Sequence, residues 1–156
     1  TKDGKLIGNS TPTKELPLHQ AFYETRGMKS GAVVHLHSTH SVALSMLPDV
    51  NEDNILPSFT PYSIMLIGKV KLLPFFVPGD PAMGEAIKGL AGKRSAVLLA
   101  NHGPVVSGKD LESSVNAIEE LEATAKLALI LKDAKPIELN ENQVRSVINK
   151  FNIDWD

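Results

Sequence analysis

Hydrophobic and polar positions along the chain fall into short apolar runs separated by longer stretches with helical spacing. The runs at residues 32–36 and 95–100 are short and rich in branched side chains, which is typical of buried strands. Residues 62–70 and 72–76 are predicted to form two further strands, and residues 104–107 a return strand after a tight turn. These segments together predict one central sheet.

Apolar residues recur with i, i+3, i+4 spacing in the segments between these strands, which predicts helices. Thr13, Asp110 and Asn140 are the residue types that commonly cap helix N-termini, and Gly27 is a typical stop. We expect helices over residues 14–26, 40–46, 81–91, 111–132 and 141–151. The alternation of strands and helices predicts an α/β fold in which helices cover the sheet.

The first residues raise the question of what precedes them. Turn signals at Asp3-Gly4 and Gly8-Asn9 bracket a short predicted strand over residues 5–9. The chain opens at Thr1 without an initiator Met, so we expect an upstream segment to be missing. Residues 1–156 are the length of one domain with a substantial core, and we interpret them as a single domain lacking an N-terminal segment.

Composition excludes several classes of protein. The chain is 42% hydrophobic and 22% charged with a formal net charge of −2, and its basic residues are scattered, which argues against a nucleic-acid partner. No apolar run is long enough to span a bilayer and no secretory segment is evident, so we expect a cytoplasmic protein without a membrane partner. The absence of cysteine leaves His, Asp and Glu as the ligands for any transition metal.

The candidate chemistry lies where two predicted strands end. His35 and His37 alternate at the end of the first run and therefore project from one side of a strand, where two imidazoles can hold one metal ion. His102 follows the run at residues 95–100. Three histidines with an open position are a catalytic zinc arrangement, to which Glu15 would add a displaceable ligand or a base.

Each of these residues also has a purely structural interpretation. A histidine of this kind can be a core residue, and a glutamate in the first turn of a helix complements the helix dipole. Thr13 and Lys14 suit helix capping and solvent exposure, with contact to an anion as the sharper alternative. We expect His40 to pack against its neighbours. The acidic run Glu119, Glu120 and Glu122 is most simply a solvated helix face.

Three motifs together carry a resemblance to a known family. Glu15-x-x-x-His19, His35-Leu36-His37 and Asn101-His102-Gly103, in this order and spacing, resemble the class II aldolase/adducin family over essentially the whole chain. Within that family, the sequence is most similar to the 3-oxo-tetronate 4-phosphate decarboxylases. This similarity is carried by the segments TPTKELPLHQAFYE, VVHLHSTHSVALSMLPD, PGDP and LLANHGPVV. The resemblance implies a three-layer α/β/α sandwich around a mostly antiparallel sheet, assembled as a homotetramer with active sites at subunit interfaces.

The resemblance also implies roles for individual residues. His35, His37 and His102 match the zinc ligands of the family, and Glu15 matches a catalytic acid/base that also binds zinc in the empty site. Thr13 and Lys14 match a pair that holds the substrate phosphate. Tyr62 matches a catalytic tyrosine that reaches across a subunit boundary, and its alternative is a core aromatic residue at the start of a strand.

The implied function is a zinc-dependent decarboxylase, with another divalent metal as a possible substitute. It would convert a 3-oxo-tetronate 4-phosphate to dihydroxyacetone phosphate and CO2 through a metal-bound enediolate. The alternatives are a fuculose- or rhamnulose-phosphate-like aldolase, a pentulose-phosphate epimerase, or a non-catalytic adducin-like interaction module. Two features of the family do not appear: the upstream Gly-Asn and Ser/Thr-Gly phosphate-binding segments, and the tyrosine-bearing tail of the fuculose-phosphate enzyme. The second absence counts against an aldolase that uses that tail.

Overall fold

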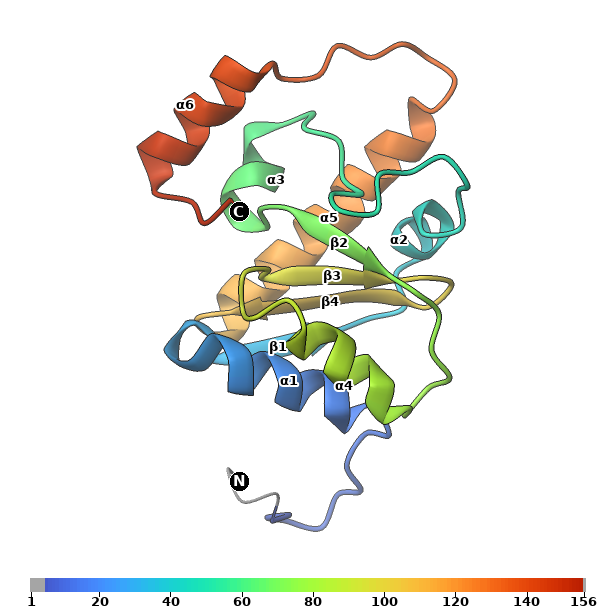
Figure 1. The fold of residues 1–156 in the computed structure, drawn as a ribbon, viewed down its shortest axis with the longest axis vertical. Coiled ribbons are helices and arrows are strands. Elements are labelled where there is room, and N and C mark those ends of the chain that lie inside the picture. Colours follow the sequence, from blue (N-terminus) through green and yellow to red (C-terminus); the bar gives the residue numbers. More distant parts are fainter. Residues whose placement is uncertain (1–4, 156) are drawn as a thin grey trace.

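A mixed sheet of four strands forms the centre of the part that the structure, a computed structural model, describes, residues 5–155 (Figure 1). The strands are β1 (Ala32–His35), β2 (Val70–Leu73), β3 (Ala96–Leu99) and β4 (Gly103–Gly108), in the order β1-β4-β3-β2. β4 pairs antiparallel with both β1 and β3, whereas β2 pairs parallel with β3. The predicted, mostly antiparallel sheet is therefore confirmed.

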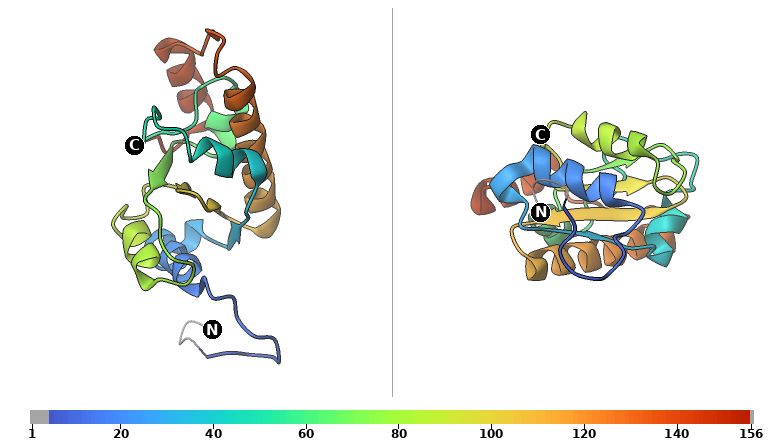
Figure 2. Two further views of the ribbon diagram at one scale, coloured as in Figure 1. Left: turned by 90° about the vertical axis from the view of Figure 1, so that its right-hand side faces the viewer. Right: turned by 90° about the horizontal axis from the view of Figure 1, so that it is seen from below.

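Side chains alternate across the strands and supply two separate cores, one on each face of the sheet. On β3, Val97 and Leu99 pack with α1 (Leu16–Arg26) and α4 (Pro81–Lys88), which lie side by side below the sheet in Figure 1. Ala96 and Leu98 face the opposite way. That face is covered by α2 (Thr39–Leu44), α3 (Pro61–Leu66) and α5 (Leu111–Ile130), and Figure 2 shows α5 running along it. The predicted three-layer α/β/α sandwich is confirmed.

Most predicted helices form, with local differences at their ends. α5 begins after Asp110 and α6 (Glu141–Phe151) after Asn140, each with a reciprocal capping box, and α1 ends at Gly27 as expected. Glu15 rather than Thr13 occupies the N-cap position of α1. α4 and α5 each end before the predicted residue, and a short 3-10 turn, η1 (Gly27–Lys29), follows α1.

Two strand predictions are wrong. Residues 62–70 hold α3, because Thr60 caps a helix whose first residue is Pro61, and the Thr60 hydroxyl accepts a hydrogen bond from the Ser63 amide at 3.4 Å. β2 starts only at Val70, after Gly68 with a φ of 74°. Residues 5–9 form no strand, and the predicted turn at residues 3–4 lies outside the described residues.

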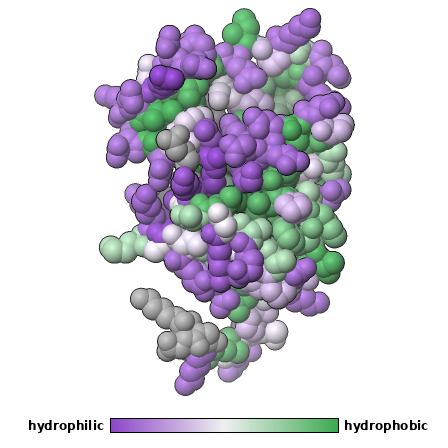
Figure 3. Space-filling view, in the orientation of Figure 1, coloured by the Kyte–Doolittle hydropathy of each residue, from purple (hydrophilic) through white to green (hydrophobic). Residues whose placement is uncertain are grey.

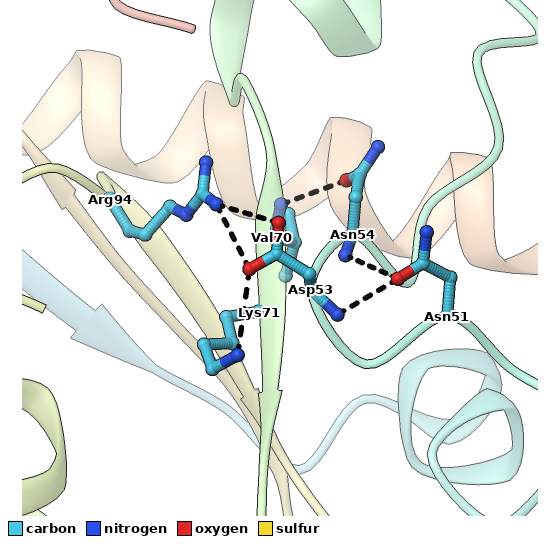
Figure 4. A network of polar contacts seen from close by, with 6 residues as sticks. All are labelled: Asn51, Asp53, Asn54, Val70, Lys71 and Arg94. Carbon is cyan, nitrogen blue, oxygen red and sulfur yellow. Dashed lines mark hydrogen bonds and ion pairs between the residues drawn. The ribbon is translucent and has the colours of Figure 1, made fainter. Parts of the chain in front are cut away.

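The loop over residues 49–60 covers the free edge of β2, which is otherwise open to pairing with another chain. The Ile55 amide donates to the Val70 carbonyl at 2.9 Å, and the Leu72 amide donates to the Glu52 carbonyl at 2.7 Å. Asp53 fastens this loop through Arg94, at 3.1 and 3.2 Å (Figure 4). The positive charge of Arg94 lowers the pKa of Asp53, so the link persists in mild acid.

None of the helices within residues 5–155 is both long enough and apolar enough to cross a membrane.

Candidate metal centre

The sheet topology brings two ligand-bearing chain segments to one edge. β1 and β3 both run antiparallel to β4, so their C-terminal ends lie at the same edge of the sheet. His35 is the last residue of β1, and His102 lies in the turn between β3 and β4. His37 follows β1 by two residues, and its ring centroid is 5.0 Å from that of His35. α1 supplies Glu15 from its N-cap position.

The four side chains converge on one point. The carboxylate of Glu15 lies 3.0 Å from Nε2 of His35 and 2.9 Å from Nε2 of His102. Nε2 of His102 is 3.2 Å from Nε2 of His37, and one ligand atom from each of the four residues lies within 4.8 Å of all the others. Ligand atoms around a tetrahedral zinc ion are about 3.3 Å apart, given bonds of about 2.0–2.1 Å. The cluster therefore has dimensions that could hold a metal ion.

The tautomer of His35 indicates whether a cation fits between His35 and Glu15. Nδ1 of His35 lies 2.9 Å from the Pro104 carbonyl, which can only accept, so the proton must be on Nδ1. Nε2 of the neutral ring then points a lone pair at the carboxylate of Glu15. Nε2 of His35, which lies 3.0 Å from Oε2 of Glu15, is buried and makes no hydrogen bond within the described residues. The same holds for Oε1 of Glu15, which lies 2.9 Å from Nε2 of His102. The lone pair of His35 and the carboxylate oxygen that it faces are both acceptors and need a cation or a proton between them, and a divalent metal satisfies both.

The electrostatic surroundings favour the neutral form of His35. Burial lowers the pKa of His35, and the neighbouring rings of His102 and His37 lower it further, whereas Pro104 and Glu15 act in the opposite direction. The side chains of Glu15, His35 and His102 are only 11%, 7% and 9% exposed. A neutral imidazole is the form that binds a metal ion, so His35 is held in the ligand state at neutral pH.

A close backbone approach fixes the spacing between the two histidine-bearing segments. Asn101 has a φ of 57°, and the His102 amide donates to the Leu99 carbonyl at 3.2 Å, which closes the turn after β3. At Gly103, a Cβ atom would collide with the Leu36 carbonyl and would come within 3.2 Å of the Cα of His37. Only glycine allows the turn to lie this close to the segment that carries His37.

Replacing Gly103 by alanine should therefore push His102 away from His37. We expect a loss of about 1–3 kcal/mol in the free energy of unfolding, since the added atom meets backbone that cannot yield, and weaker zinc binding. Denaturant unfolding and zinc titration measure the two effects. Gly27→Ala is the matched control, because Gly27 also has a positive φ, 55°, but nothing lies within 4 Å of its Cβ position. Equal effects of the two variants would contradict the collision.

The residues predicted to hold phosphate lie immediately before the cluster. The Thr13 hydroxyl accepts a hydrogen bond from the Glu15 amide at 3.3 Å, and both Thr13 and Lys14 are exposed. Gly79, in the segment between β2 and α4, packs against the backbone of Lys14. Figure 3 shows hydrophobic surface along the right-hand side of the molecule, where the segment between β2 and α4 runs in Figure 1. Phe75, which belongs to this segment, is 59% exposed. An apolar segment thus flanks the predicted phosphate residues.

Other predicted residues lie outside the cluster. Tyr62 is on α3 and is 60% exposed, so its interpretation as a core aromatic residue at a strand start is wrong. Tyr62 is not among the four converging side chains, none of which lies on α3.

Two further histidines also lie outside the cluster. His19 lies one turn along α1 from Glu15 and forms a hydrogen bond with the Val33 backbone, and burial lowers the pKa of His19. His40 packs against its neighbours as expected, with Nδ1 2.7 Å from Glu122.

Sequence reasoning missed one polar contact near the cluster, which Glu122 makes with the start of α2. The prediction of a solvated acidic face is wrong for Glu122, whose carboxylate accepts hydrogen bonds from His40 and Ser41. Burial opposes ionisation of Glu122, but these hydrogen bonds outweigh it and lower its pKa. Glu120 similarly bonds Thr60 at 3.4 Å. The available signal was the start of α2, whose free N–H groups require an acceptor.

The structure defines an α/β domain with a cluster of three histidines and one carboxylate that could hold a metal ion, and comparison with known proteins identifies its family. Residues 1–129 match the Class II Aldolase and Adducin N-terminal domain family. The chain is 46% identical over 137 residues to the 3-oxo-tetronate 4-phosphate decarboxylase of Escherichia coli O6:H1, covering 88% of this chain and 64% of that protein. It is 40% identical to the Haemophilus influenzae protein of the same name, covering 95% of this chain and 70% of that protein.

Solved structures show the same architecture. The crystal structure of YgbL from Escherichia coli, a putative aldolase/epimerase/decarboxylase, superimposes with a TM-score of 0.89 at 40% identity, covering 94% of this chain and 70% of that one. An L-fuculose 1-phosphate aldolase superimposes with a TM-score of 0.80 at 27% identity, covering 97% of this chain and 69% of that one. This chain belongs to the class II aldolase/adducin family. It spans 64% of the length of the Escherichia coli decarboxylase that it matches.

Proposed function

We propose that this chain carries the active centre of a zinc-dependent decarboxylase that converts a 3-oxo-tetronate 4-phosphate to dihydroxyacetone phosphate and CO2. The observation that carries the proposal is the convergence of Glu15, His35, His37 and His102, with ligand atoms within 4.8 Å of one another. The identity of 40–46% to relatives named for this reaction supports the choice of substrate.

The three histidines would hold the ion, with Glu15 as a fourth ligand that the substrate displaces. When bound, the metal supplies Lewis acidity, which stabilises negative charge developing on a carbonyl oxygen. Zinc suits a site of three imidazoles and a carboxylate with no thiolate, although other divalent ions accept the same donor set.

The remaining steps belong to residues of the chain. Thr13 and Lys14 would bind the substrate phosphate and so place the other end of the substrate beside the histidines. Cleavage of the C1–C2 bond releases CO2 and leaves its electron pair on C2, from which it delocalises into the C3 carbonyl to give an enediolate. Once displaced from its resting position, the Glu15 carboxylate would take up a proton from solvent and deliver it to C2, which completes dihydroxyacetone phosphate.

The proposal extends to a homotetramer in which Tyr62 acts in the active site of a neighbouring subunit. Tyr62 is 60% exposed on α3, and a side chain that serves a neighbouring subunit has to be accessible in this way. Tyrosine suits such a position, because its ring packs in an interface while its hydroxyl donates to a ligand.

The test uses zinc-loaded protein and 3-oxo-tetronate 4-phosphate, with CO2 and dihydroxyacetone phosphate measured in parallel. Equal rates of release of the two products, abolished by a chelator and restored by zinc, are the expected result. Metal binding without release of either product would exclude the proposed reaction.

A sugar-phosphate aldolase is the second candidate. The chain is 32% identical to an L-fuculose phosphate aldolase of Methanococcus maripaludis over 133 residues. An aldolase would form the same enediolate by releasing an aldehyde in place of CO2, so one metal site serves both reactions. Cleavage of a ketose 1-phosphate to dihydroxyacetone phosphate, without CO2 release from the tetronate, would favour this candidate.

A further inference from the structure

The short helix α2 follows one of the two segments that carry the histidines and is hydrogen-bonded to the other. It begins at Thr39, two residues after His37. Just beyond its other end, the buried hydroxyl of Ser45 accepts a hydrogen bond from the amide of Asn101, the residue before His102, at 3.0 Å. A displacement of α2 would therefore shift the positions of both His37 and His102.

A single carboxylate holds the start of α2. Oε1 of Glu122 accepts from the amide of His40 at 2.9 Å and from Nδ1 of its ring at 2.7 Å. Oε2 accepts from the amide of Ser41 at 2.9 Å and from its hydroxyl at 2.6 Å. The two amides belong to the first turn of the helix, where backbone donors have no partner inside the helix. Glu122 thus satisfies four donors from two adjacent residues.

The helix that carries Glu122 is a rigid support. α5 is 20 residues long, and Leu121 and Ala125, which flank Glu122 on this helix, belong to the same buried core as Leu44 of α2. Toward its N-terminus, the Ser114 hydroxyl of α5 donates to the Ala32 carbonyl at 3.1 Å, at the start of β1. α5 therefore holds both the beginning of β1 and the helix that follows its end, with His35 and His37 between these two attachments.

We propose that Glu122 is a positioning residue of the metal centre, which holds α2 so that His37 and His102 stay aimed at one ion. The proposal rests on the proposed metal-binding function of the four-residue cluster. Hydrogen-bonded groups behind metal ligands orient those ligands, and their loss weakens metal affinity even though they never touch the ion. Glu122 acts here one step further back, through the backbone of α2.

The experiment compares Glu122→Gln with Glu119→Gln in the full chain. Glutamine keeps the shape of the side chain, but its NH2 group cannot accept hydrogen bonds. The two donors that share one carboxylate oxygen of Glu122 would therefore face an N–H donor in place of an acceptor. Glu119 is exposed on the same helix and undergoes the same change of charge. Zinc affinity is measured by competition with a chromophoric chelator, ligand geometry by the visible spectrum of bound cobalt(II), and folding by thermal unfolding with and without zinc.

We expect Glu122→Gln to bind zinc about 10–100-fold more weakly than the parent chain, and Glu119→Gln to bind it unchanged. The cobalt spectrum should change only in Glu122→Gln, and the rise in Tm on zinc addition should shrink. Glu122→Gln with a lower Tm but parental zinc affinity and cobalt spectrum would overturn the proposal, because Glu122 would then act on stability alone.

A second variant decides the case in which Glu122→Gln does not fold. Ser41→Ala removes only the hydroxyl donor to Oε2, and about three- to tenfold weaker zinc binding is expected. Parental affinity in Ser41→Ala would then overturn the proposal. Measurements on the parent chain distinguish the proposed role of Glu122 from the proposed reaction. Zinc binding without CO2 release would reject the decarboxylase activity and leave the role of Glu122 intact. Failure of the parent chain to bind zinc rejects both.

Discussion

Replacing His37 by alanine should weaken zinc binding by at least about 100-fold and reduce turnover to the level of the metal-free protein. His37 supplies one of three nitrogens, and Nε2 of His102, 3.2 Å away, would lose its neighbour. Two histidines and one carboxylate then remain, and the carboxylate is the ligand that the substrate is expected to displace. Isothermal titration with zinc and the CO2 assay measure the two losses.

His37 is the most informative of the three histidines to remove. His37 is exposed, whereas His35 and His102 have largely buried side chains. Removal of the His37 side chain therefore leaves the core intact. His40→Ala provides the comparison, because it removes a histidine three positions along and only one of the four hydrogen bonds to Glu122. Like Ser41→Ala, it should weaken zinc binding only about three- to tenfold. Similar losses in both variants would show that His37 is no more a ligand than His40.

The parts of the fold predictable from the sequence are those set by local signals. The apolar run before His35 forms a strand, and Asp110 and Asn140 cap helices, because a short branched run and a capping side chain act within a few residues. His35 and His102 could be assigned to one edge of the sheet, since His35 ends a strand and His102 lies in the turn after another. Their roles as metal ligands stay predictions.

The errors arise where two local signals compete or where a partner lies far along the chain. Residues 62–70 contain branched apolar residues, yet Thr60 and Pro61 start a helix there, and this start signal prevails. Glu122 lies in an acidic run that suggests solvent exposure, but its partners His40 and Ser41 are 82 and 81 positions away, respectively. A contact of that separation is created by packing α2 on α5, which no local pattern encodes.

Glu15 is held less firmly than the three histidines, which suits a ligand that the substrate displaces. The three histidines come from strand ends and turns tied to the sheet, as the hydrogen bonds of His35 to Pro104 and of Asn101 to Ser45 indicate. Glu15 instead stands at the N-cap of α1, where no side-chain capping bond fixes it. A carboxylate that makes no capping bond within residues 5–155 could leave an ion without disrupting the helix, which is what a proton carrier requires.

Glu15→Gln should therefore separate metal binding from proton transfer. The amide has the shape of the carboxylate, and three histidines remain to hold the ion, so we expect zinc to stay bound with somewhat weaker affinity. Turnover should fall by about 10²–10⁴-fold, the usual contribution of a positioned acid or base, because an amide cannot deliver a proton. Bound zinc per chain and the rate of dihydroxyacetone phosphate formation are the two measurements.

Glu24→Gln is the matched control, since Glu24 lies on the same helix and pairs with Lys88 at the surface, at 2.9 Å. It should leave both measurements unchanged. The fate of the carbon atoms adds a further distinction: if CO2 release persists in Glu15→Gln while dihydroxyacetone phosphate forms slowly, Glu15 acts after decarboxylation, as a donor to C2. If both products slow together, its proton transfer is coupled to loss of the carboxylate. Full turnover with zinc bound would exclude Glu15 as the proton carrier and leave it a ligand alone.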